Sequence, residues 1–245
     1  MSKLPLKIYF YPIILFALFS CLLPFNQPLK ISAADNDFLL AWSSASYVPQ
    51  EYKGRALPSN GSLVKVFALP TKDLARSQES FYYRWLLDNE LAYSANGQAK
   101  SYFNFTITKW GGDKHEVECQ ILDSDENIIW RGFLTIGVVD PEVLLKTGTS
   151  NYALSDSLAT NTGRDLNFTA WPLFFRAQQP SDLTFEWTLD QQTLSANEGK
   201  NPNYLTIKIP SGKLSESLFK NLSLLVKNKA DELQQLRMDL IIEIK

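Results

Sequence analysis

An internal repeat of about 100 residues constrains the fold of this chain more than any other feature of its sequence. The segment Phe81–Asp88 reads Phe-Tyr-Tyr-Arg-Trp-Leu-Leu-Asp, and it returns as Leu183–Asp190, Leu-Thr-Phe-Glu-Trp-Thr-Leu-Asp. Trp85 and Trp187 are therefore 102 residues apart. Other apolar runs recur at nearly the same spacing, and the small drift falls in loops, which tolerate insertions. A repeat of this length predicts two copies of one structural unit.

The recurring segments alternate between apolar and polar residues, as half-buried strands do. The paired segments are Val64–Ala68 with Leu166–Ala170, Phe103–Ile107 with Leu205–Ile209, Val117–Ile121 with Leu222–Val226, and Leu134–Val138 with Leu240–Ile244. Turn-rich loops separate them, and six or seven short strands in each unit predict a two-sheet antiparallel sandwich. We therefore predict an all-β fold, with two tandem immunoglobulin-like antiparallel β-sandwiches after an N-terminal apolar helix or signal segment.

The pattern restarts at Asp140-Pro141, which divides the chain into predicted domains. We assign 1–34 to a signal peptide or membrane anchor, 35–139 to the first immunoglobulin-like domain and 140–245 to the second. Each domain is expected to bury its Trp at the centre of the core, between the two sheets. The predicted core residues are Tyr83, Trp85 and Cys119 in the first domain and Phe185, Trp187 and Leu224 in the second. Because Cys119 has no partner cysteine in the predicted mature chain, aromatic packing is expected to hold these cores.

The first 34 residues have the layout of an export signal. Two lysines precede the largely apolar stretch Ile8–Phe25, and Ser32-Ala33-Ala34 supplies small residues for cleavage after Ala34. An uncleaved anchor through residues 8–25 stays open, because this stretch approaches the length that spans a bilayer. Lipidation of Cys21 is a third interpretation. All three place residues 35–245 outside the cytoplasm, at the cell surface or in the extracellular space, and bring the N-terminal segment to the membrane at least during export.

Charge and motifs exclude several classes of function. The formal net charge is −2, and removal of the signal segment would make the chain more acidic, because that segment holds three lysines and no acidic residue. We therefore expect no nucleic-acid partner, since such a protein needs a basic face. No glycine-rich phosphate loop is present. The chain is predicted to carry no cofactor and no catalytic residues; a hydrolase with an unrecognised carboxylate pair is the enzymatic alternative.

The sequence holds two candidate metal-binding features. His115 is the single histidine, and we predict it to lie exposed in a loop, without a metal. Asp123-x-Asp125-x-Asn127 resembles the start of a calcium loop but lacks the glycine and glutamate that follow in such loops. A solvated hairpin turn is the preferred interpretation, with a structural calcium ion as the alternative.

Three further segments carry predictions of local structure. Asn228–Leu236 has helical propensity, but the repeat makes it a hairpin with a somewhat longer loop. Lys213–Phe219 has the spacing of a single helical turn. Thr147–Asp165 is polar and is predicted to form a loop.

Several blocks of the sequence resemble predicted surface proteins of small-genome candidate-phyla (Patescibacteria-type) bacteria. These blocks are Tyr47–Ser62, Tyr83–Asp88, Val138–Val143 and Phe185–Asp190. The resemblance covers nearly all of Phe38–Ile244 and implies tandem immunoglobulin-like, PKD-like domains behind a signal sequence, with a suspected link to adhesion or type IV pili. The chain departs from the family after Pro141-Glu142, where an aromatic-acidic stretch and a glycine are usual. That departure puts any ligand shared at this junction in doubt.

These observations favour an exported, non-enzymatic surface protein for adhesion, cell-envelope scaffolding or pilus-associated assembly. Its partners would be other envelope or surface proteins. The alternative is a pair of carbohydrate-binding modules that bind a glycan on exposed aromatic residues. Trp110 is the candidate platform, joined by Trp42 and Trp130 if they are exposed, although burial of all three is the stronger expectation.

The loops offer the best place to look for function, because they differ most between the two copies of the repeat. The loops in question are Tyr47–Gly61, Lys109–Lys114 and the Asp140–Asp165 junction.

Overall fold

The computed structural model describes residues 37–71, 81–148, 154, 156–195 and 201–245. The predicted signal segment lies outside these residues. Residues 36–245 form one compact unit. Within the described part of the chain, no helix combines the length and the hydropathy needed to cross a membrane.

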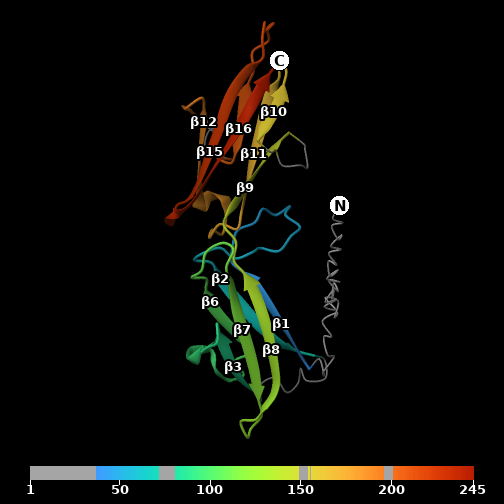
Figure 1. Ribbon diagram of the computed structural model, residues 1–245, viewed down its shortest axis with the longest axis vertical. Helices are drawn as coiled ribbons and strands as arrows, with labels where there is room; N and C mark the ends of the chain where they lie inside the picture. Colours follow the sequence, from blue (N-terminus) through green and yellow to red (C-terminus); the bar gives the residue numbers. More distant parts are fainter. Residues whose placement is uncertain (1–36, 72–80, 149–153, 155, 196–200) are drawn as a thin grey trace, which may run out of the picture. The chain divides into compact units, whose positions relative to one another are not determined.

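The first half of the chain forms a sandwich of two β-sheets (Figure 1). Its strands are β1 (Phe38–Ser44), β2 (Leu63–Pro70), β3 (Tyr82–Leu87), β4 (Glu90–Leu91), β5 (Gly97–Gln98), β6 (Tyr102–Thr106), β7 (Lys114–Leu122) and β8 (Ile128–Gly137). One sheet has the order β1-β2-β6, and the other has the order β4-β3-β7-β8 with β5 paired to β3. A short 3-10 helix, η2 (Tyr93–Ala95), lies between β4 and β5.

The second half repeats this arrangement. Its strands are β9 (Glu142–Thr147), β10 (Ser157–Thr160), β11 (Asp165–Leu173), β12 (Leu183–Leu189), β13 (Gln192–Leu194), β14 (Tyr204–Lys208), β15 (Leu218–Asn228) and β16 (Asp231–Ile244). One sheet has the order β14-β11-β9 and the other β10-β16-β15-β12-β13. The 3-10 helix η3 (Pro180–Asp182) precedes β12. All pairs are antiparallel except β10 with β16, which is parallel.

The strand order is that of an immunoglobulin-like sandwich. Apart from the short strands β4, β5, β10 and β13, each half has six main strands. The first two share a sheet with the fourth, and the third pairs with the fifth, which pairs with the sixth, as strands A, B and E oppose C, F and G. The predicted fold is therefore confirmed. Two clusters of buried apolar residues match the two halves, one from Phe38 to Val138 and one from Val143 to Ile244. The predicted domain boundaries themselves stay a prediction.

The two tryptophans occupy equivalent places in the two cores. Both side chains are completely buried, and each indole Nε1–H donates to a backbone carbonyl fifteen residues later. The acceptor is Lys100 O at 2.9 Å for Trp85 and Pro202 O at 3.1 Å for Trp187. Such a bond satisfies the one polar group of a buried indole, so each Trp can fill the space between the sheets without an unpaired donor.

The other predicted core residues lie beside these tryptophans. Cys119 lies opposite Trp85 on the neighbouring strand, and Leu224 lies opposite Trp187. Both are buried, as is Tyr83, whereas Phe185 is only partly buried at the margin of the second core. Cys119 is a free cysteine, and burial raises the pKa of its thiol, which keeps it protonated and unreactive.

The prediction that His115 lies exposed in a loop was wrong. The strand β7 begins at Lys114, so His115 shares the inward face with Val117 and Cys119, and its side chain is only 2% exposed. The imidazole Nδ1 lies 2.8 Å from Asp88 Oδ2, and the ring stands edge-on to Phe105 with 5.3 Å between centroids. The period-2 alternation of β7 therefore extends two residues further than the apolar residues alone suggest.

Two predictions of local structure also need correction. Lys213–Phe219 forms no helical turn; the segment has no regular structure up to Ser217, with a bend at Ser215 and Glu216, and Leu218 and Phe219 begin β15. Within the expected loop Thr147–Asp165, the strand β10 pairs with the end of β16. The hairpin expected at Asn228–Leu236 is present, but its loop is shorter than predicted, because β15 ends at Asn228 and β16 starts at Asp231.

Candidate functional site

The loop between β1 and β2 connects the two halves of the chain. The Tyr47 N–H donates to Phe175 O at 2.8 Å, and Phe174 N–H donates to Tyr47 O at 2.7 Å. The rings of Tyr52 and Phe174 meet edge-on, with 6.0 Å between centroids. This loop therefore makes both backbone and side-chain contacts with the second half.

A buried chain of polar side chains continues this connection. Ser59 Oγ donates to Phe174 O at 2.6 Å and accepts from Gln234 Nε2 at 3.1 Å. Gln234 Oε1 in turn accepts from Asn228 Nδ2 at 2.9 Å and from Arg176 N–H at 2.7 Å. Because each group is buried and bonded, any displacement would leave polar atoms without partners. We call Ser59, Gln234, Asn228 and the Arg176 backbone the junction network.

A small hollow of about 60 Å³ opens beside the junction network. We call it the junction hollow, and its walls are Asn60, Trp110, Asp140, Pro141, Asp231, Leu233 and Gln234. Three loops singled out from the sequence contribute to it, through Asn60, Trp110 and Asp140-Pro141. The remaining walls come from the β15–β16 hairpin, which the sequence did not point to.

Trp110 and Leu233 are the apolar walls of this hollow, and both are strongly exposed. Trp110 is 63% exposed and Leu233 is 85% exposed. The expectation that Trp110 would be buried is therefore wrong, because Trp110 lies in the loop between β6 and β7 and not on a strand that faces the core. On β16, Leu233 points outward because the next residue, Gln234, points inward to the junction network.

The loop around Trp110 is shaped by two glycines. Gly112 has a left-handed φ of +90°, which closes the turn before β7. At Gly111, any side chain would collide with the carboxyl group of Asp140, so glycine permits that approach. Asn60 Nδ2 also donates to Lys109 O at 3.1 Å. These contacts fix the position of Trp110 although its indole is open to solvent.

The other two tryptophans of the hypothetical sugar platform lie elsewhere. Trp42 on β1 is partly buried, and the guanidinium of Arg55 lies 4.7 Å above its ring. Trp130 on β8 is also partly buried and packs against Phe38, with 5.4 Å between ring centroids. The three side chains therefore do not form one platform, and Trp110 is the one that offers an open face.

The acidic hairpin turn between β7 and β8 is closed by its own first residue. Asp123 Oδ1 accepts from the N–H groups of Asn127 and Asp125, each at 2.9 Å. The hydrogen bond from the Asn127 N–H is the main cause of a pKa of Asp123 below its ordinary value. Across the described residues, no group of three or more His, Cys, Asp or Glu side chains could hold a metal ion.

No protein-family model matches this chain, and no curated protein matches it either. Among solved structures, the fibronectin(III)-like modules of CbhA from Clostridium thermocellum are 12% identical to this chain, with a TM-score of 0.27. The match covers 84% of this chain and 94% of that chain. The ectodomain of mouse nectin-like molecule 4 matches with 10% identity, 85% and 64% coverage and a TM-score of 0.32.

A third structure is Bacteroides ovatus SGBP-B in complex with a mixed-linkage heptasaccharide. It matches with 10% identity, 83% coverage of this chain, 47% of that chain and a TM-score of 0.26. The chain thus spans less than two thirds of the nectin-like and Bacteroides proteins. The immunoglobulin-like fold follows from the strand order of the two sandwiches.

Proposed function

We propose that this chain is an exported, non-enzymatic binding protein of the cell surface, and that it recognises a partner protein at the junction hollow. The observation that carries this proposal is the pairing of Trp110 and Leu233 at one hollow, both strongly exposed. Single exposed apolar residues are ordinary on a protein surface. Two exposed apolar residues that share a hollow beside hydrogen-bonded backbone form the kind of anchor that protein interfaces use. Tryptophan is a frequent hot spot in such interfaces.

The rigidity around the hollow supports this reading. Gln234 belongs both to the hollow and to the junction network, so the wall beneath Leu233 is tied to Ser59 by a hydrogen bond. A surface that is ordered before the partner arrives loses less conformational entropy on binding. Asp140 and Asp231 also line the hollow, and the Asp231 carboxylate is already paired with the Arg176 guanidinium at 3.4 Å. The carboxylate of Asp140 therefore favours a partner with a basic group beside its apolar centre.

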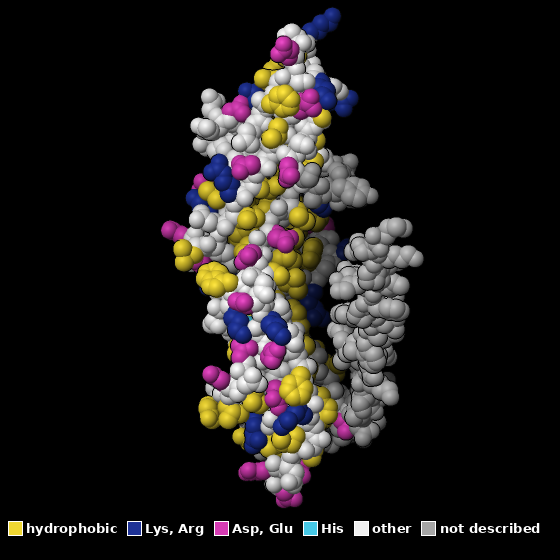
Figure 2. Space-filling model, in the orientation of Figure 1, with side chains coloured by type: hydrophobic (Ala, Val, Ile, Leu, Met, Phe, Trp, Pro, Cys, Tyr) yellow, Lys and Arg dark blue, Asp and Glu magenta, His cyan; other side chains and the backbone are white. Residues whose placement is uncertain are grey.

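The setting of the proposed contact is the cell envelope. The export pattern at the N-terminus supports this location. A location in the envelope is compatible with adhesion, scaffolding or pilus-associated assembly. On the face drawn in Figure 2, acidic and basic side chains are interspersed, without one large basic region. That distribution favours a protein partner over a polyanion.

A glycan is the second candidate ligand. It is favoured by the open indole of Trp110 with polar side chains beside it, including Asn60 and Asp140. A sugar ring can stack on an indole while amide and carboxylate groups bond its hydroxyls. Leu233 would contribute little to such stacking, and this difference separates the two candidates.

The test compares capture of envelope proteins from intact cells by the wild-type chain and three variants. We expect Trp110→Ala and Leu233→Ser to lose a captured protein that Tyr93→Ala retains, because Tyr93 is 80% exposed on η2 away from the hollow. Saturable glycan binding that disappears in Trp110→Ala but persists in Leu233→Ser would instead establish the carbohydrate reading. Equal capture by all four chains would overturn the proposed site, and a cytoplasmic location in cell fractionation would overturn export.

A further inference from the structure

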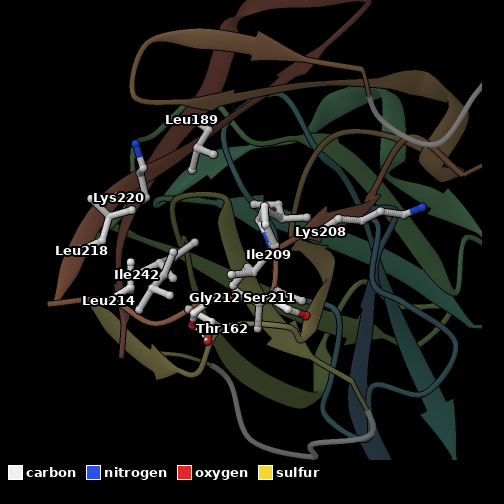
Figure 3. Close-up of a pocket in the computed structure, with 14 residues that line it drawn as sticks. Thr162, Leu189, Lys208, Ile209, Ser211, Gly212, Leu214, Leu218, Lys220 and Ile242 are labelled. Atoms are coloured by element: carbon white, nitrogen blue, oxygen red, sulfur yellow. Dashed lines mark hydrogen bonds between the residues drawn. The ribbon is translucent and has the colours of Figure 1, made fainter. Parts of the chain in front are cut away.

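A larger hollow lies at the end of the second sandwich away from the junction. It has a volume of about 400 Å³ and opens where the loop between β14 and β15 leaves the sheets (Figure 3). Its walls are mostly aliphatic, and those used below are Leu189, Ile207, Leu214, Leu218 and Ile242. We call it the apolar pocket. It lies at the Leu218 end of β15, and the junction hollow lies near the Asn228 end.

In the first sandwich, side chains fill the position that matches the apolar pocket. Phe105 pairs with Val64 across β6 and β2, and Ile207 pairs with Leu166 at the matching register of β14 and β11. Phe105 and Ile207 are therefore equivalent positions. In the first sandwich the Phe105 ring is buried and contributes to the core at the place where Ile207 lines a hollow.

A second ring is also missing from the second sandwich. Glu116 N–H donates to Asp88 Oδ1, and Asn221 N–H donates to Asp190 Oδ1, each at 2.9 Å. The residue before each donor is His115 in the first sandwich and Lys220 in the second.

These two residues behave differently. The His115 ring is buried against Phe105. The Lys220 ammonium lies 2.6 Å from Asp190 Oδ2, and its side chain extends away from Leu214 and Ile242 (Figure 3). The apolar pocket is thus the space that two rings fill in the other copy.

We infer that the apolar pocket binds an aromatic side chain of a partner polypeptide. The volume falls within the ordinary range of ligand pockets, and a mostly aliphatic lining suits an aromatic ring. The first sandwich shows that the same framework accommodates rings at this place. Leu214 and Leu218, 42% and 43% exposed, continue the apolar surface to the mouth, so a polypeptide would cover area that a free ring leaves open.

The inference does not depend on the proposed function at the junction hollow. A ring bound here would reach neither Trp110 nor Leu233, which belong to the other hollow. A Leu233→Ser variant therefore keeps the apolar pocket intact and serves as its control.

The test measures binding of N-acetyl-tryptophanamide and of a short tryptophan-containing peptide to the full chain by calorimetry. We expect saturable binding of both, tighter for the peptide, and a loss of about tenfold or more in affinity in Ile207→Phe, because the new ring fills the pocket. Leu233→Ser should bind as the wild type does. A leucine-containing peptide of the same length should bind more weakly than the tryptophan peptide.

A second variant guards against misfolding of Ile207→Phe. Lys220→His places a ring where the first sandwich has His115, beside an aspartate that can hold it, and it should also weaken binding. No saturable binding by the wild type, or full binding by both filled variants, would overturn the inference. Binding of the free amide without binding of the peptide would also overturn it, because the ligand would then be a small aromatic compound.

Discussion

At the scale of single residues, the two buried tryptophans are the clearest determinants of stability. Trp85→Ala should lower the free energy of unfolding by about 3–5 kcal/mol, because it leaves a large cavity and an unpaired carbonyl at Lys100. Urea denaturation would measure this, with the loss expected mainly in the unfolding of the first sandwich. Trp110→Ala is the control, and it should change the free energy by no more than about 0.5 kcal/mol. Equal destabilisation of both halves would show that the two sandwiches unfold as one cooperative unit.

Asp88 ties two strands of the first sandwich together and makes its stability depend on pH. Burial alone would raise the pKa of this carboxyl group, but hydrogen bonds from the Glu116 N–H, the Lys109 ammonium and the His115 ring outweigh it. Its pKa therefore lies below the ordinary value. A carboxyl group with a lowered folded pKa stabilises the fold above its unfolded pKa of about 4, and this stabilisation disappears as pH falls through the folded value.

Substitution of Asp88 tests this dependence. We expect Asp88→Asn to be less stable than the wild type at pH 6 and to lose less further stability between pH 5 and pH 2, since the titrating group is gone. Urea midpoints of the first sandwich across this range would show it. Asp125→Asn, in the exposed β7–β8 turn, is the control and should follow the wild-type curve. Parallel curves for the wild type and Asp88→Asn would contradict the assignment.

At the scale of elements, the hairpins after β3 and β12 use the same two-residue turn. Asp88-Asn89 and Asp190-Gln191 all have positive φ, between 48° and 68°, as a type I′ turn requires. Asparagine tolerates this conformation, whereas glutamine does not favour it. Gln191→Gly should therefore raise the free energy of unfolding by about 0.5–1 kcal/mol. Asn89→Gly should gain less in thermal or urea denaturation, and a larger gain there would contradict this account.

The elements also show which parts of the fold the sequence can predict. Strands that bury one face, such as β2 and β7, leave an alternating pattern that is local and readable. The strand β10 leaves no such pattern, because its pairing with β16 is decided by a neighbour far along the chain. Leu214 and Leu218 have helical spacing, yet they form no helix. Both line the apolar pocket, and Leu218 is the first residue of β15. There, tertiary contacts override the local preference.

The candidate site was predictable only in part, for the same reason. The loops that differ between the copies pointed to Asn60, Trp110 and Asp140, and the structure brings these side chains to one hollow. Leu233 was missed, because a longer hairpin loop was expected where β16 already alternates. With the turn placed correctly, alternation alone would have shown an outward leucine beside an inward glutamine.

At the scale of the whole molecule, the junction network decides whether the two sandwiches unfold together. Gln234 is the link between them, because it bonds Ser59 from the first half and Asn228 and Arg176 from the second. The network is buried, so its loss cannot be fully compensated by water. Cooperativity between the sandwiches should therefore depend on this single side chain more than on any exposed contact.

Gln234→Ala tests this coupling. It should lower the free energy of unfolding by about 1–3 kcal/mol, because Asn228 and the Arg176 N–H would lose their shared acceptor. Calorimetry should also show the transitions of the two sandwiches moving apart. Gln235→Ala is a matched control, since that neighbouring side chain points outward and is exposed. If both variants unfold in one transition with wild-type cooperativity, the loop contacts of Tyr47 and Tyr52 hold the halves together, and the polar network is dispensable.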